Sequence, residues 1–76
     1  MKAFRVVGYD VTTYVHAENA GKARMFTALQ VHDCGFAATV GRALAGLRVT
    51  RAPALDDECD AGRPRYVPVE LWEDKP

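Results

Sequence analysis

The 76-residue chain is 49% hydrophobic and 26% charged, a composition that excludes an intrinsically disordered segment. Ten basic and ten acidic residues give no net charge. This argues against non-specific nucleic-acid binding and against mimicry of DNA, because both need a large excess of one charge. The sequence has no apolar run near the ~18 residues that span a bilayer and no signal-peptide segment. We therefore expect a single cytoplasmic domain over residues 1–76, either monomer or homodimer, because so small a core can need a partner.

The first two segments have the alternating pattern of β-strands. Phe4 to Tyr9 alternates with Phe4 and Val6 on one face,. From Val11 to Ala17, every second residue is expected to face the core, whereas Thr12, Tyr14 and His16 face outward. Gly8 and Asp10 lie where a turn is expected. A hairpin is therefore favoured, with a single bent strand as the alternative.

Two helices are expected next. Asn19 is a good N-cap for a helix that ends between Asp33 and Gly35, and it is expected to pack through Met25, Phe26 and Leu29, with Thr27 on the opposite side. A second helix is predicted from Phe36 to Leu47, where Gly46 marks its end. Its apolar stripe consists of Phe36, Val40, Ala43, Leu44 and Leu47.

The last third of the chain returns to the sheet. Leu47 to Arg51 is predicted as a third strand that Pro53 terminates. Residues 54–65 form an acidic surface loop, and Tyr66 to Trp72 alternates again, but Pro68 restricts it to an edge strand or an extended tail. The sequence thus predicts an α+β fold with a three- or four-stranded, mainly antiparallel sheet and two helices on one face. The expected core consists of Phe4, Val6, Val15, Phe26, Leu29, Phe36, Val40, Leu44, Leu47 and Val49.

Two surfaces are candidates for binding. If the helices cover one sheet face only, the other face presents aromatic and basic side chains, which can anchor a protein, stack on RNA bases or simply pair across strands. These are Arg5, Tyr9, Tyr14, His16 and Arg48. The second surface is acidic, because residues 1–50 carry six basic and three acidic groups (+3) whereas residues 51–76 carry four and seven (−3). Its cluster is Asp56, Asp57, Glu58 and Asp60, which is either solvated or docks into a basic protein groove. It lacks the glycine and terminal glutamate of an EF-hand calcium loop.

Catalytic and metal chemistry are not expected. His16 or His32 would have to pair with Cys34 or with an acid, and no motif surrounds them with an oxyanion hole. A zinc site at His32 and Cys34 would need two further ligands, for which only His16 and Cys59 remain. A disulfide between Cys34 and Cys59 is possible, but a cytoplasmic chain normally keeps both thiols reduced. We therefore expect no enzyme, no cofactor and no metal.

Three segments together resemble short proteins of phages and prophages: Tyr14–Glu18 (YVHAE), Gly21–Arg24 (GKAR) and Leu47–Pro53 (LRVTRAP). Among these, the chain is similar to small anti-CRISPR proteins that act on type I systems, type I-C among them. The resemblance covers residues 3–53 and consists of structural elements, so no functional residue carries over.

The resemblance implies a protein of the host cell's cytoplasm that binds the type I Cascade surveillance complex stoichiometrically and blocks target DNA or the recruitment of the nuclease-helicase. The contact would come from the acidic cluster or from the sheet face around Tyr9, Tyr14 and Arg48, with no direct specific DNA binding. The alternative is a phage or prophage accessory protein that binds another host protein or an RNA.

Overall fold

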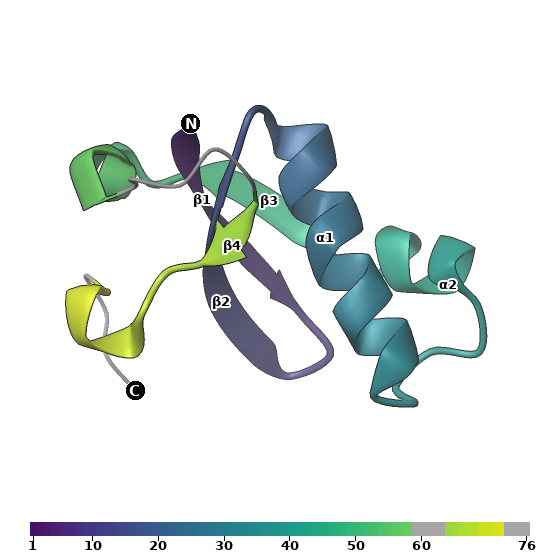
Figure 1. Cartoon of the computed structure of the whole chain (residues 1–76). Helices are drawn as coiled ribbons and strands as arrows, with labels where there is room; N and C mark the ends of the chain where they lie inside the picture. Colours follow the sequence, from purple (N-terminus) through teal and green to yellow (C-terminus); the bar gives the residue numbers. More distant parts are fainter. Residues whose placement is uncertain (59–63, 73–76) are drawn as a thin grey trace.

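A computed structural model describes residues 1–58 and 64–72. Within these residues the chain forms a four-stranded antiparallel sheet of order β3-β1-β2-β4, with two helices against one face (Figure 1). The elements are β1 (Lys2–Gly8), β2 (Val11–Ala17), α1 (Ala20–Asp33), α2 (Val40–Ala45), β3 (Arg48–Arg51), the 3-10 turn η1 (Pro53–Glu58), β4 (Arg65–Tyr66) and the 3-10 turn η2 (Val69–Leu71). The predicted α+β fold is confirmed.

Strands β1 and β2 form a hairpin with a two-residue turn, in register from Lys2↔Ala17 to Gly8↔Val11. Tyr9 and Asp10 both adopt left-handed backbone conformations, with φ of 53° and 59°, as a type I′ turn requires. A left-handed backbone conformation costs a residue such as tyrosine about 1–2 kcal/mol. Tyr9 is held there because its hydroxyl donates a hydrogen bond of 2.7 Å to the Arg42 carbonyl and its ring packs on the core. The predicted hairpin is confirmed.

Helix α1 begins as predicted, because the Asn19 side chain accepts a hydrogen bond of 2.9 Å from the Lys22 amide. Its packing face is different from the prediction. The buried residues are Ala23, Thr27, Ala28 and Val31, whereas Met25 and Leu29 are 42% and 48% exposed. Small side chains let the helix lie close to the sheet, and the Thr27 hydroxyl is satisfied by the Ala23 carbonyl at 3.0 Å. The predicted contacts of Met25 and Leu29 are therefore wrong.

Helix α2 is shorter than predicted. It begins at Val40 because the Thr39 side chain caps it by accepting the Arg42 amide at 3.1 Å. Phe36, which was expected to start the helix and join the core, is 61% exposed. The helix packs against α1, where the Arg24 guanidinium donates to the Leu44 carbonyl. Ala43 is buried in α2 and Leu44 is half-buried.

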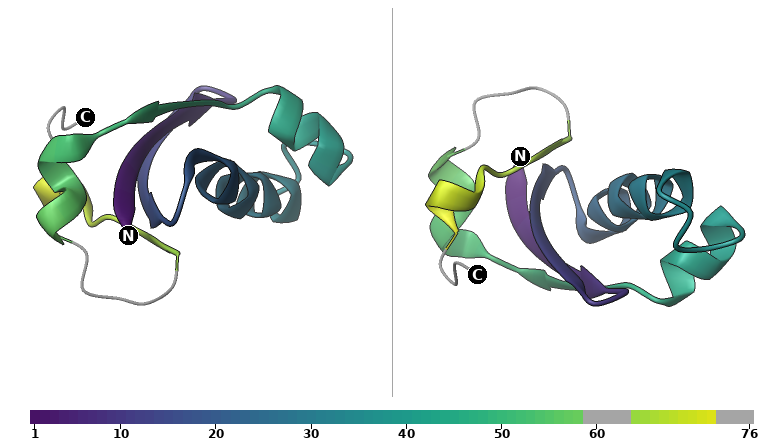
Figure 2. Two further views of the ribbon diagram at one scale, coloured as in Figure 1. Left: turned by 90° about the horizontal axis from the view of Figure 1, so that it is seen from above. Right: turned by 90° about the horizontal axis from the view of Figure 1, so that it is seen from below.

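A second layer covers the other face of the sheet, so the prediction of an open face is wrong. Figure 2 shows the sheet lying between the two helices and the two 3-10 turns. Leu55 of η1 completes a second apolar cluster with Ala3, Tyr14, Ala52 and Val67, and Trp72 packs against it. The two faces of this small sheet therefore each carry a core. The sequence pattern missed the second one because Tyr14 and His16 are polar enough to be assigned to solvent.

The third strand forms as predicted, whereas the last strand is shorter than predicted, because residues 69–71 form η2 instead of continuing it. Arg48–Arg51 pairs with β1, and Pro53 follows directly at the start of η1. Strand β4 pairs with β2 through Val15↔Tyr66 and His16↔Arg65 only, and Pro68 follows the ladder at the outer edge. Of the expected core, four side chains are buried and four are half-buried, whereas Leu29 and Phe36 are exposed. The buried four are Phe4, Val6, Val15 and Leu47; the half-buried four are Phe26, Val40, Leu44 and Val49.

Candidate functional site

An open groove of about 670 Å³ lies beside the outer edge of β2. Its walls come from the hairpin, from the C-terminal part of α1 and from the segment that follows β4. None of the residues that line it is charged. They are Val6, Gly8, Tyr9, Val11, Thr12, Thr13, Thr27, Gln30, Val31, Cys34, Phe36, Leu47, Tyr66, Val67, Pro68, Val69 and Trp72.

Aromatic contacts hold the segment after β4 in place. On the helix side of the sheet, the Tyr66 ring meets the Phe26 ring edge-on at 4.8 Å between centroids. On the other side, the Trp72 ring lies 5.2 Å from the Tyr14 ring, and its indole N–H donates to the Val67 carbonyl at 2.9 Å. The groove wall is therefore fixed by packing on both faces of the sheet. Sequence reasoning missed this groove, because its lining comes from segments far apart in the chain.

The acidic cluster is only partly available for docking. Asp56 forms a bidentate ion pair with Arg51, at 2.6 and 2.9 Å, and accepts the Ala3 amide at 2.7 Å. The hydrogen bonds from Arg51 and then from Ala3 lower the pKa of the Asp56 carboxyl well below its ordinary value. Asp57 and Glu58 belong to η1, and Asp60 lies outside the described residues. The Asp56 carboxylate is therefore already paired with Arg51, and docking through the acidic cluster stays a prediction.

The Asp56 contact predicts an acid-sensitive fold. Because folding lowers the pKa of Asp56, its contribution to stability is present above about pH 4, the ordinary carboxyl pKa, and is lost as the pH falls further. The melting temperature should fall as the pH is lowered below about 4. In Asp56→Asn and in Arg51→Gln, the melting temperature should fall less over the same pH range. A pH series of circular dichroism melts measures it. If the melting temperatures of both variants fell with pH as steeply as that of the wild type, the acid sensitivity would not come from the Asp56–Arg51 contact.

The structure does not bring the five residues of the predicted sheet face together. Tyr14 and His16 are only 3% and 2% exposed, because the second core covers them. Tyr9 packs on the helix side through its turn conformation. Arg48 is exposed on β3 and Arg5 is half-buried on β1. An aromatic binding surface of the predicted kind is therefore not formed.

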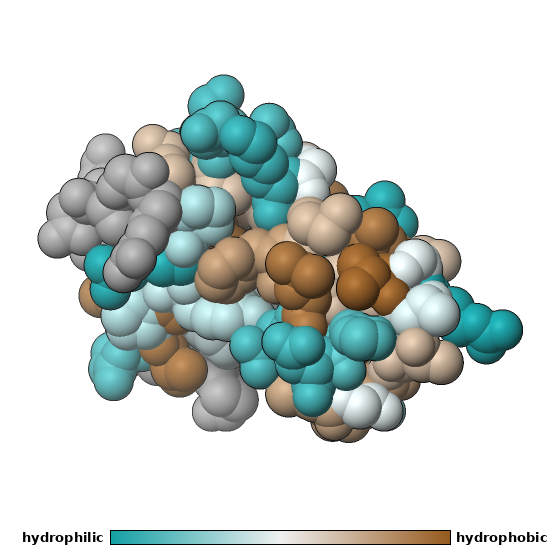
Figure 3. Space-filling model, turned by 45° about the vertical axis from the view of Figure 1, so that its right-hand side comes forward, coloured by the Kyte–Doolittle hydropathy of each residue, from teal (hydrophilic) through white to brown (hydrophobic). Residues whose placement is uncertain are grey.

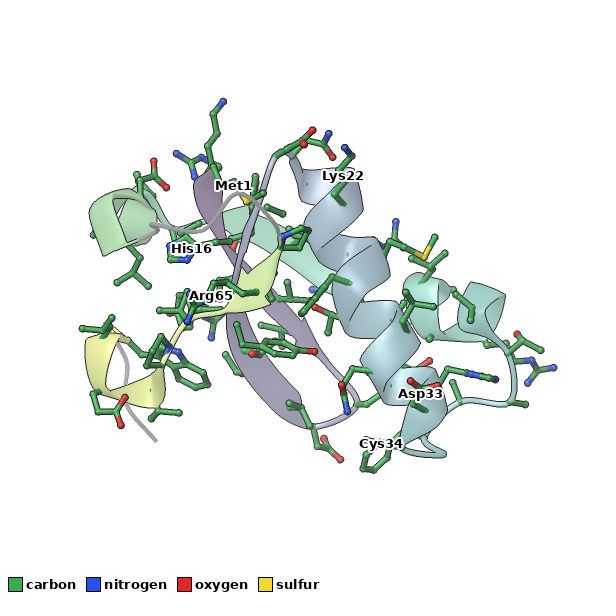
Figure 4. The ribbon with its side chains drawn as sticks, in the orientation of Figure 1. Met1, His16, Lys22, Asp33, Cys34 and Arg65 are labelled. Atoms are coloured by element: carbon green, nitrogen blue, oxygen red, sulfur yellow. The ribbon has the colours of Figure 1, made fainter. Side chains whose placement is uncertain are left out.

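The histidines and Cys34 are also separated. His16 lies between the sheet and η1 (Figure 4), where its Nε2–H donates to the Leu55 carbonyl at 2.8 Å. Cys34 is exposed at the C-terminal end of α1, on the other face of the sheet. The Nδ1 atom of His32 lies 3.9 Å from an Asp33 oxygen in a largely exposed pair. Among the described residues, no three or more His, Cys, Asp or Glu side chains could hold a metal together.

Exposed apolar side chains form a second surface, on the helices. Figure 3 shows hydrophobic side chains gathered over this side of the molecule. On α1 the large exposed ones are Met25 and Leu29. We call these two the helical patch. The sequence prediction concealed it, because it placed both residues on the packing side of the helix.

Comparison with known proteins gives no relative: no family model, curated protein or solved structure matches the chain. Within residues 1–58 and 64–72, none of the helices is both long enough and apolar enough to cross a membrane.

Proposed function

We propose that this protein is a stoichiometric inhibitor that binds the Cascade complex of a type I CRISPR system and blocks its access to target DNA. The choice of target rests on the resemblance of residues 3–53 to small anti-CRISPR proteins. The observation that supports binding is the groove beside β2, which is open, apolar and free of charged lining residues. An apolar concavity with a few polar groups is a common binding site.

The uncharged lining favours a protein partner over the alternative of an RNA, because RNA binding draws on basic residues that contact phosphates. It also moves the expected contact away from the acidic cluster, where Asp56 is already paired with Arg51. A groove contact depends on apolar burial and is only weakly affected by salt. An acidic contact would weaken as salt rises, because exposed charges are screened within about 10 Å at 0.1 M. Salt dependence therefore separates the two surfaces.

The expected result in cells is loss of CRISPR interference. Bacteria that carry a type I system, type I-C first, should regain sensitivity to a targeted phage when they express this protein. A tagged copy should capture Cascade subunits, and the purified complex should no longer shift target DNA in a gel. Undiminished interference with every type I subtype would contradict the proposal. Capture of a different host protein or of RNA would instead support the accessory-protein alternative.

Two matched variants locate the contact. Val11 lies in the groove lining and Leu29 in the helical patch, and they are 47% and 48% exposed. Each can therefore be changed to lysine with little expected cost to the fold. Val11→Lys should weaken Cascade binding by at least about tenfold, because a charge is forced into an apolar contact. Leu29→Lys should bind normally. The opposite pattern would assign the contact to the helical patch.

A further inference from the structure

Only part of the outer edge of β2 is paired with another strand. Gly8 and Val11 flank the two-residue turn and form a hydrogen-bonded pair. Along the hairpin, hydrogen-bonded pairs therefore alternate with non-hydrogen-bonded pairs. The backbone N–H and C=O of Thr12, Tyr14 and His16 therefore point away from β1. Val67, the residue after β4, reaches Tyr14, whose carbonyl accepts the Val67 amide at 2.9 Å. Nothing in the described part of the chain hydrogen-bonds to the Thr12 backbone.

The ladder stops before Thr12 because the chain leaves the edge after Pro68. Continuing the register would place Pro68 beside Thr13, whose backbone groups face β1, and Val69 beside Thr12. The chain then turns into η2, where the amides of Leu71 and Trp72 bond back to the carbonyls of Pro68 and Val69. The place beside Thr12, which a longer β4 would have filled, opens into the apolar groove. The groove is thus a direct continuation of the β2–β4 interface.

The stretch formed by β4 and Val67 shows which kind of segment this edge accepts. Its side chains alternate between the two faces of the sheet, as in any strand. Tyr66 packs on the helix-side core and Val67 is 2% exposed in the second core. The groove repeats this arrangement, because Val31 and Phe36 line it from the helix side and Trp72 lines it from the other side. An extended segment could therefore bury alternate side chains in both walls.

We propose that the groove binds an extended, uncharged segment of the protein partner as an added β-strand, paired with Thr12 and continuing the line of β4. This rests on the proposed binding function and specifies its contact. β-Strand addition takes its affinity from main-chain hydrogen bonds and its specificity from pockets for alternate side chains. The uncharged lining selects apolar or neutral residues. Residues 73–76, which carry Glu73, Asp74 and Lys75, do not have this chemistry.

The test uses the isolated full chain and an acetylated, amidated pentapeptide of alternating valine and threonine. Trp72 is the only tryptophan and lines the groove, so its fluorescence reports occupancy. At saturating peptide, hydrogen exchange of the Thr12 amide, followed by NMR, should slow at least tenfold. Thr12→Pro removes the outward-facing N–H and also fixes φ at about −65°, a change that an edge position tolerates. It should weaken peptide binding about three- to tenfold, the effect of one hydrogen bond.

Thr12→Val is the matched control, because it keeps the amide and the β-branched shape. It should bind the peptide within about twofold of wild type. Equal binding by Thr12→Pro and Thr12→Val, or by a peptide N-methylated at every amide, would overturn the added strand. So would absence of binding, or protection of Thr12 that rises with protein concentration alone, which would identify a second copy as the occupant. None of these measurements involves Cascade, so their outcome does not depend on the result of the interference assay.

Discussion

Replacing Tyr14 with alanine is expected to lower the free energy of unfolding by about 3–5 kcal/mol, the range for large aromatic core residues. Tyr14 is 3% exposed, and its ring packs with Trp72 and the second apolar cluster. A chain of this length has about 4–11 kcal/mol of stability in total. The variant should therefore lose a large share of its stability, and it would be largely unfolded if the wild-type stability lies at the low end of this range. Urea unfolding followed by circular dichroism measures the change.

The control for Tyr14 lies on the same strand. Val11 is 47% exposed, so Val11→Ala should change stability by no more than about 0.5 kcal/mol. If Tyr14→Ala is too unstable to measure, Tyr14→Leu retains part of the buried area and gives a measurable curve. Nearly equal stabilities of the Tyr14 and Val11 variants would contradict the burial of Tyr14 and the existence of the second core.

Replacing Gly8 with alanine is expected to destabilise the protein by about 1–3 kcal/mol or more, as overpacking does. A Cβ atom on Gly8 would overlap the Gly46 carbonyl oxygen and lie 2.8 Å from the Leu47 Cδ2 atom. The neighbouring atoms include backbone at the junction of α2 and β3, so they cannot rotate aside like a flexible side chain. Thermal unfolding of the two proteins, at equal concentration and pH, measures the loss.

Gly41 is the matched control for Gly8. It lies inside α2, and a Cβ atom there would meet only the Thr39 hydroxyl at 3.9 Å, an ordinary contact. Gly41→Ala should therefore raise stability by about 0.5–1 kcal/mol, because alanine favours a helix over glycine. If both substitutions shift stability in the same direction and by the same amount, the close approach of Gly8 to the α2–β3 junction is wrong.

These stability measurements also bear on the proposed binding site. Tyr14 and Trp72 hold the segment after β4, and that segment forms one wall of the groove. A loss of Cascade binding in Tyr14→Ala would therefore reflect loss of fold. Val11→Lys and Thr12→Pro carry the functional test, because both change exposed or outward-facing groups. Each must first be shown to melt near the wild-type temperature.

The sequence by itself determined the elements and their order. Period-two alternation predicted the hairpin, Asn19 predicted the start of α1, and Pro68 restricted the last strand to an edge. These predictions succeeded because each depends on local backbone chemistry: a cap that satisfies an amide, or a proline that cannot donate. The resemblance to anti-CRISPR proteins also came from the sequence, and it stays a hypothesis for the experiments above.

Only the tertiary structure decided which faces are buried and where a partner could bind. Met25 and Leu29 are apolar but exposed, because α1 approaches the sheet through small residues such as Ala23 and Ala28. Tyr14 is buried because segments some 40 and 50 residues further along the chain, η1 and the residues after β4, fold back over it. The groove arises where the chain turns into η2 after Pro68 and so does not continue along the edge of β2 beside Thr12. Burial depends on such long-range contacts, and neither composition nor periodicity encodes them.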